Sequence, residues 1–250
     1  MLLELLDRPA TTAAESVALL DALVSPYVGI VRGVEEVVGE PFDIRLPNLC
    51  CETGYLGPQQ TGAGSAAERT SARAAAIGEA VERYAACESD HVDAVVASAR
   101  ELGARALAPE RFALHSAAQY AQAGFPYQPF TSDTPVAWLT GFSLADGEPA
   151  LLPAQLVYLH WNLRDGEQRI ARSTSSGLAC RPTLEESLLS GLLELLERDA
   201  FMLTWKARLS WPRLTWRPGS SLGAFERRFV APAGLSVAAL DLSAVWDVPT

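Results

Sequence analysis

Two similar ten-residue stretches decide how this sequence is interpreted: AIGEAVERYA at Ala76–Ala85 and GLLELLERDA at Gly191–Ala200. Each contains the pattern E-x-x-E-R within a segment rich in helix-forming residues. The pattern supplies four glutamates, which are Glu79, Glu82, Glu194 and Glu197. A repeat so widely spaced indicates a duplicated supersecondary unit rather than a solenoid of short repeats.

Helical geometry groups the polar residues of each copy. At about 100° per residue, they fall on one narrow stripe of each helix. The two stripes consist of Ser71, Glu79, Glu82 and Arg83 on the first helix, and Ser187, Ser190, Glu194, Glu197 and Arg198 on the second. The rest of the second helix is almost entirely large and apolar, so we expect it to be mostly buried.

The stripes allow two interpretations. In the first, each stripe faces a thin strip of solvent, and i,i+4 pairs such as Glu79 with Arg83 add a few tenths of a kcal/mol of helix stability. In the second, the stripes face each other and four carboxylates converge, which requires cations and suits Mg²⁺ or Ca²⁺. Mg²⁺ brings phosphates with it, and neighbouring arginines would contact their oxygens. The repetition favours this magnesium–phosphate site over a di-iron centre, because no histidine follows either glutamate pair.

The composition narrows the function classes. Thirty acidic and 20 basic residues give a net charge of −10, which argues against nucleic acid or an anionic membrane as partner. The four cysteines form no CxxC pair, so neither a zinc ribbon nor a disulfide framework is indicated. The N-terminus lacks a basic signal-peptide region, and no apolar stretch is long enough to span a bilayer. We therefore expect a soluble protein of a reducing, cytoplasmic compartment.

The pattern of apolar and turn residues predicts strands that alternate with long helices. We expect helices over residues 1–25, 62–88, 92–102, 184–208 and 222–229, and strands over 27–38, 43–57, 136–144, 150–160, 167–173 and 235–242. This order points to an α/β (α+β) fold in which mixed sheets pack against long helices, including the pseudo-duplicated E-x-x-E-R unit. We expect residues 1–25 to form a helical lead-in and residues 26–250 to form one domain without an internal boundary. Because the chain stops just after a strand, we also expect it to be truncated at its C-terminus.

At these motifs the chain resembles the YcaO superfamily, and within it the cyclodehydratases that form azolines in ribosomal peptides. Besides the two repeats, the matching stretches are Gly62–Gly64, Thr174–Ala179, Trp138–Gly141, Pro153–Ala154 and Phe201–Trp205. The resemblance implies that ATP and Mg²⁺ bind between the two helices. By position, the metal ligands would be Glu79, Glu82, Glu194 and Glu197, and the nucleotide contacts would include Ser190, Arg198 and Arg83. The resemblance identifies no catalytic residue in this chain.

The resemblance also implies a reaction and partners. In cyclodehydratases a Cys, Ser or Thr side chain of a precursor peptide attacks the preceding amide carbonyl, ATP phosphorylates the oxyanion, and phosphate leaves to give thiazoline or oxazoline. Such an enzyme, expected in bacterial natural-product biosynthesis, would work with a protein that binds the leader peptide, and it could form a homodimer. Thioamide formation, amidine formation and a non-catalytic scaffolding role remain as alternatives.

Three departures from the family pattern stand out. A serine of the family is replaced by Ala75, and no lysine precedes Lys206, so Arg69 is the candidate for the phosphate contact that a lysine often makes. The family's third motif, Q-x-x-x-R, and its C-terminal segment would lie beyond Thr250.

The Ser173–Gly177 loop could bind phosphate through its N–H groups or serve only as a turn, and Cys180 is interpreted as a packing residue.

Overall fold

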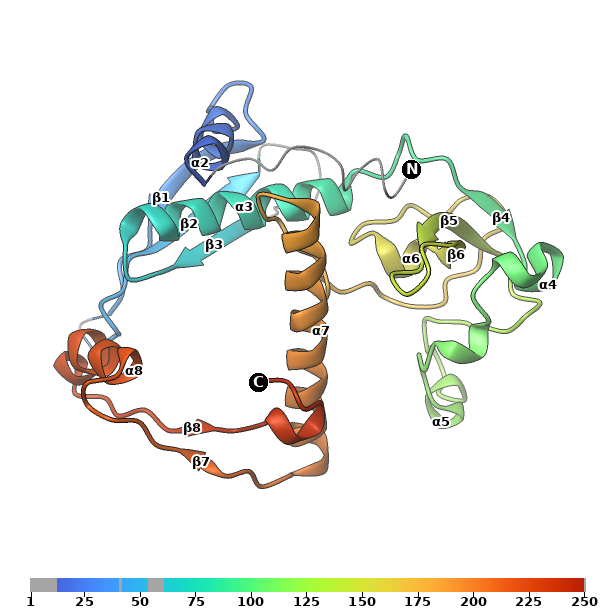
Figure 1. The fold of residues 1–250 in the computed structure, drawn as a ribbon. Helices are drawn as coiled ribbons and strands as arrows, with labels where there is room; N and C mark the ends of the chain where they lie inside the picture. Colours follow the sequence, from blue (N-terminus) through green and yellow to red (C-terminus); the bar gives the residue numbers. More distant parts are fainter. Residues whose placement is uncertain (1–12, 41, 54–60, 250) are drawn as a thin grey trace. The chain divides into compact units, whose positions relative to one another are not determined.

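The computed structural model describes residues 13–40, 42–53 and 61–249 (Figure 1). The chain divides into two compact units. The α3–α7 unit contains residues 13–82 and 176–249 of the described chain, and the β4–β6 unit contains Arg83–Ser175. The chain passes between them inside one helix and again in the loop before another, and neither crossing is marked by a change in composition.

In the α3–α7 unit, a helix lies along a three-stranded sheet (Figure 1). The sheet has the order β1-β2-β3, and the elements that lead up to and form this layer are α2 (Ala13–Ala22), β1 (Val31–Glu36), β2 (Asn48–Thr53), β3 (Thr61–Ser65) and α3 (Arg69–Cys87). The core joins apolar strand residues such as Val31 and Leu49 to the alanine-rich face of α3, including Ala76 and Ile77. Small residues on α3 therefore let helix and sheet approach closely.

The rest of this unit consists of the helix that carries the second glutamate pair and the elements that follow this helix. Its elements are α7 (Leu184–Ala207), β7 (Arg213–Leu214), α8 (Ser221–Phe225), a π-helical turn (Glu226–Val230), a 3₁₀ turn (Ala231–Ala233), β8 (Ala239–Leu240) and a second 3₁₀ turn (Ser243–Val245). Helix α7 begins as the sequence predicts, because the Thr183 hydroxyl accepts a hydrogen bond from the N–H of Glu186 at 3.2 Å. It ends at Arg208, which adopts a left-handed conformation with φ 53°.

The β4–β6 unit is built on a second three-stranded sheet, of order β4-β5-β6. Its elements, after the last turn of α3, are β4 (Val95–Ala97), α4 (Ala99–Leu102), 3₁₀ turns at Gly103–Arg105 and Pro109–Arg111, α5 (Ala117–Tyr120), β5 (Val136–Phe142), β6 (Pro149–Pro153) and α6 (Ala154–Val157). Trp138 of β5 is almost fully buried, and its indole N–H donates to the carbonyl of Ala97. The hairpin between β5 and β6 turns at Gly147, with φ 76°, as the Asp-Gly pair predicts.

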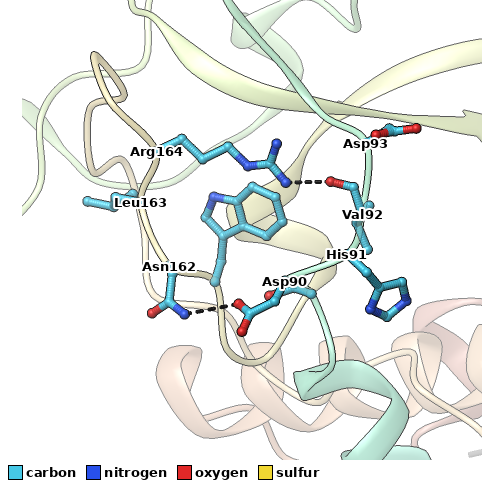
Figure 2. A pocket seen from close by; sticks show the side chains of 9 residues that line it. Asp90, His91, Val92, Asp93, Asn162, Leu163 and Arg164 are labelled. Atoms are coloured by element: carbon cyan, nitrogen blue, oxygen red, sulfur yellow. Dashed lines mark hydrogen bonds between the residues drawn. The ribbon is translucent and has the colours of Figure 1, made fainter.

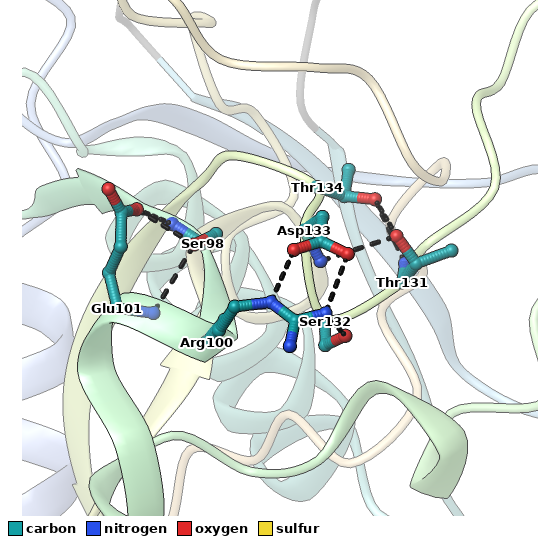
Figure 3. A network of polar contacts seen from close by, with 7 residues as sticks. All are labelled: Ser98, Arg100, Glu101, Thr131, Ser132, Asp133 and Thr134. Atoms are coloured by element: carbon teal, nitrogen blue, oxygen red, sulfur yellow. Dashed lines mark hydrogen bonds and ion pairs between the residues drawn. The ribbon is translucent and has the colours of Figure 1, made fainter.

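A polar network ties α4 to the loop before β5 (Figure 3). Ser98 and Glu101 form a capping box at the start of α4. The Arg100 guanidinium binds the Asp133 carboxylate through two hydrogen bonds of 2.5 and 2.8 Å, and Arg100 N–H donates to the carbonyl of Ser132. Hydrogen bonding to Arg100 lowers the pKa of Asp133 below its usual range.

The α+β class is confirmed, while several expected elements differ. Within each described sheet the strand pairs are antiparallel rather than mixed. Residues 61–65 form strand β3 instead of the start of a helix, since glycines 62 and 64 let a strand lie against α3. The expected helix over residues 92–102 is β4 followed by one turn capped at Ser98, and residues 167–173 form no strand. Leu56–Pro58 and residues 1–12 of the N-terminal lead-in lie outside the described residues.

Candidate functional site

Helix α3 presents the first glutamate pair to a cavity within the α3–α7 unit. Glu79 and Glu82 line this cavity, whose volume is about 540 Å³. Its other walls come from aliphatic side chains of α2 and of Leu23 just after it, from the small residues Ser71, Ala74, Ala75 and Gly78 of α3, and from Cys180–Pro182 ahead of α7. The cavity is therefore mainly apolar, with two carboxylates on one wall.

Glu79 is held by the neighbouring strand. One of its carboxylate oxygens accepts a hydrogen bond from the backbone N–H of Ala63 at 2.6 Å. Strand β3 lies at the edge of its sheet, where a backbone N–H would otherwise lack a strand partner. This contact requires close packing: a Cβ added at Gly62 would lie 2.1 Å from the carbonyl oxygen of Ala76. Glycine at this position therefore brings the N–H of Ala63 within reach of α3.

Glu194 on α7 is held in the same way by a different segment. Its carboxylate accepts a hydrogen bond from the backbone N–H of Gly177 at 3.1 Å. Gly177 has φ 87°, a conformation that favours glycine, and its carbonyl oxygen would lie 2.4 Å from a Cβ added at Gly191. The Ser173–Gly177 loop thus uses one of its N–H groups to bind the protein's own carboxylate.

The other residues predicted for the site lie on the same two helices. Glu82, Arg83 and Ser190 are partly buried, whereas Glu197 and Arg198 are exposed. Arg69, expected to replace a phosphate-binding lysine, forms an ion pair with Glu36 instead.

The prediction that α7 is mostly buried is wrong. Of its residues only Gly191 and Ala200 are buried, and Trp205 is 70 % exposed. Burial follows size here, because the small Gly191 admits the Gly177 loop while the bulky leucines and aromatics of α7 remain outside.

The described residues contain no group of three or more His, Cys, Asp or Glu side chains placed to hold a metal ion. Convergence of all four glutamates around a metal therefore stays a prediction. The donors themselves fit Mg²⁺, which prefers carboxylate oxygens. They also fit in number, because Mg²⁺ in proteins commonly takes one or two carboxylates and completes its coordination with waters and phosphate oxygens.

Cys180 is closer to the candidate site than the sequence suggested. Its sulfur lies 3.9 Å from the position of a Cβ at Gly78, and the thiol lines the same cavity as Glu82. Burial, followed by the negative charge of Glu82, raises the pKa of this thiol. The contribution of α2 was also missed, since its Leu20 and the following Leu23 carry no chemical signature and only their place in the fold brings them to the cavity.

A second cavity, of about 370 Å³, lies in the β4–β6 unit and contains none of the predicted site residues (Figure 2). Arg164 crosses it, donating to the carbonyls of Val92 and Ala94 and lying 5.0 Å from the centre of the Trp161 ring. Asn162 donates to the Asp90 carboxylate at 3.3 Å across the same opening. The polar groups of this cavity are thus used largely by one another.

The chain matches, over residues 63–250, the family model described as YcaO cyclodehydratase, ATP- and Mg²⁺-binding. This chain belongs to the YcaO family. A curated relative, an uncharacterised protein of Methanothermobacter thermautotrophicus, is 29 % identical over 229 residues, which cover 89 % of this chain and 55 % of the relative. The chain therefore spans about half the length of that relative.

Several solved structures share the fold. A heterocyclase in complex with substrate and cofactor is 27 % identical with a TM-score of 0.74, covering 93 % of this chain and 34 % of its own. The YcaO protein of Methanopyrus kandleri, bound with AMPPCP and Mg²⁺, is 20 % identical with a TM-score of 0.61 and covers 87 % and 52 %. The heterocyclase TruD is 24 % identical with a TM-score of 0.64 and covers 94 % and 30 %. The last two similarities concern the fold alone.

None of the helices in the described parts of this YcaO chain combines the length and hydropathy that a membrane span requires.

Proposed function

We propose that this chain binds Mg²⁺ and ATP through its two E-x-x-E-R helices and uses them to activate a backbone amide of a peptide. The observation that carries the proposal is the repeated arrangement on α3 and α7. In each copy the first glutamate, Glu79 or Glu194, accepts a hydrogen bond from the backbone of a glycine-containing segment. The family description and the AMPPCP and Mg²⁺ bound to the Methanopyrus kandleri protein support the choice of ligands.

The chain's own residues have distinct parts in this proposal. Glu79, Glu82, Glu194 and Glu197 would hold Mg²⁺, and Ser190, Arg198 and Arg83 would contact the nucleotide. The cavity beside Glu79 and Glu82 combines apolar walls with two carboxylates, which suits a ligand with a flat apolar part and a metal-bound charged part. Bound MgATP would supply an electrophilic phosphoryl group and neutralise the charge that develops on it.

The proposed reaction is cyclodehydration. A thiol or hydroxyl of the peptide loses its proton to solvent and forms a bond to the preceding amide carbon, and the amide oxygen takes the γ-phosphoryl group with release of ADP. Phosphate then leaves as the C=N bond forms and the N–H proton passes to solvent, which gives thiazoline or oxazoline. A precursor peptide is the substrate in this proposal, and a leader-binding protein assists. The heterocyclase solved with substrate and cofactor supports azoline formation over thioamide or amidine formation.

Nucleotide binding tests the first part of the proposal. We expect calorimetric titration with AMPPCP to show binding that requires Mg²⁺ and weakens at least tenfold in Glu194→Gln. Glu185→Gln, an exposed acidic residue on the same helix outside the motif, is the matched control and should bind as the wild type does. Equal affinity in Glu194→Gln and wild type, or binding indifferent to Mg²⁺, would refute the proposal.

The reaction is tested separately by mass spectrometry. A synthetic peptide containing Cys, Ser and Thr is incubated with ATP, Mg²⁺ and the protein, together with a leader-binding partner. Cyclodehydration removes one water from the peptide and produces equivalent ADP and phosphate. Thioamide formation instead exchanges one oxygen for sulfur. Binding of AMPPCP without any change in the peptide would favour the scaffolding alternative.

A further inference from the structure

We propose that the backbone N–H groups of Ala63 and Gly177 are paired positioning groups, which hold Glu79 and Glu194 in equivalent orientations for cation binding. The inference rests on the proposed function and names the part of the chain that orients two of its ligands. Sequence comparison of the two helices shows the repeated acidic pattern only, because backbone donors leave no residue signature.

The first argument is that the two contacts are equivalent. In both copies the acceptor is the first glutamate of E-x-x-E-R, and the donor is a backbone N–H located 16 residues earlier for Glu79 and 17 residues earlier for Glu194. The donors lie in dissimilar structures, an edge strand and a loop. Two unrelated local structures thus form the same hydrogen bond to the same position of the repeat. This indicates that the bond has the same role in both copies and does not simply result from the packing of one strand.

The second argument is that close packing supports both bonds at matching positions. Ala76 and Gly191 occupy the same place in the repeat, three residues before the glutamate, and both are buried. Ala76 meets Gly62, where an added Cβ would lie 2.1 Å from its carbonyl oxygen. In the second copy the glycine is on the helix: a Cβ added at Gly191 would lie 2.4 Å from the carbonyl oxygen of Gly177. In each copy a glycine thus allows backbone to touch backbone, and the donor reaches the carboxylate one helical turn further on.

The third argument concerns chemistry. A carboxylate that accepts an N–H bond is fixed in rotamer, and a fixed orientation favours a metal ligand. The positioning groups act through the glutamates and touch neither peptide nor nucleotide in this proposal. Removing a donor should therefore weaken metal-dependent binding while leaving metal-independent binding unchanged.

Ala63 allows the donor to be deleted alone. Proline lacks the N–H and is tolerated on edge strands where that group points away from the sheet, and the Ala63 side chain is exposed. We expect Ala63→Pro to weaken AMPPCP binding at least fivefold in the presence of Mg²⁺. Ala63→Ser, which keeps the N–H at the same exposed position, is the matched control and should bind as wild type.

A double-mutant cycle separates positioning from a general structural effect. If Ala63 acts through Glu79, then Ala63→Pro should cause no further loss in a Glu79→Gln background. Additive losses in the cycle would overturn the proposal. If the wild-type protein shows no Mg²⁺-dependent binding of AMPPCP, the proposed function is refuted. The two hydrogen bonds are then tested by hydrogen exchange.

Hydrogen exchange on the wild-type chain keeps the inference testable if Ala63→Pro does not fold. Using ¹⁵N-labelled protein, we would measure exchange of the Ala63 and Gly177 amides with and without AMPPCP and Mg²⁺. Both amides should be protected in the free protein and remain at least as protected after binding. Faster exchange of either amide on binding would mean that its glutamate leaves the donor to reach the metal, and would overturn the proposal.

Discussion

Substitution of Gly64 by alanine tests how closely β3 must approach α3. A Cβ at this position would lie 2.1 Å from the carbonyl oxygen of Ala72 and 2.5 Å from the nitrogen of Ala76. Both atoms belong to the backbone of α3, so neither can rotate away, and relief requires strand and helix to separate by roughly 1.5 Å, judged against the 3.5–4.0 Å of ordinary contacts. Overpacking of this kind typically costs 1–3 kcal/mol, and the rigidity of both partners places Gly64→Ala near the upper end, at about 3 kcal/mol.

The assay is urea denaturation, combined with hydrogen exchange over α3 so that the α3–α7 unit is followed by itself. For a protein of this size, a loss of about 3 kcal/mol in the free energy of unfolding corresponds to a fall in melting temperature of roughly 6–12 °C. Gly33→Ala in strand β1 of the same sheet is the control, because no atom lies within 4 Å of its added Cβ. If Gly64→Ala and Gly33→Ala agree to within about 0.5 kcal/mol, the contact between β3 and α3 is looser than the structure shows and the reasoning fails.

Three further predictions concern single side chains. Glu82→Gln should lower the raised pKa of the Cys180 thiol by removing the nearby negative charge. Alkylation of Cys180 near pH 8, followed by peptide mass spectrometry, should then become several-fold faster, and an unchanged rate would contradict the effect of the Glu82 charge. Glu167→Gln should destabilise the β4–β6 unit by about 2 kcal/mol, because each Glu167 carboxylate oxygen accepts two hydrogen bonds and a glutamine NH₂ would face two of the four donors. A loss of unfolding free energy below about 0.5 kcal/mol in urea denaturation would count against this. Hydrogen bonding to Arg100 lowers the Asp133 pKa, so its contribution to stability is present above the unfolded-state pKa near 4 and is lost as pH falls through the lower folded-state value. Asp133→Asn should therefore lower the melting temperature at neutral pH, and its difference from wild type should disappear as the pH falls through the acidic range. An equal effect at neutral and acidic pH would disprove the assignment.

The sequence by itself determined the features that depend on local chemistry. Helix α7 begins at the Thr183 cap and α3 covers the alanine-rich segment, because capping and helix propensity act over a few residues. The turn at Gly147 follows from an Asp-Gly pair for the same reason. The repeated E-x-x-E-R pattern also sufficed to indicate the YcaO family, which the family match confirms.

Only the tertiary structure decided what depends on partners distant in the chain. Residues 62–65 were expected to begin a helix, yet residues 61–65 form a strand because Gly62 and Gly64 pack on α3. The apolar composition of α7 predicted burial, yet burial depends on which surfaces meet, and there the small Gly191 is buried while Trp205 is exposed. The donors to Glu79 and Glu194 are backbone N–H groups, which every residue except proline carries, so no pattern of side chains can reveal where the fold will place them.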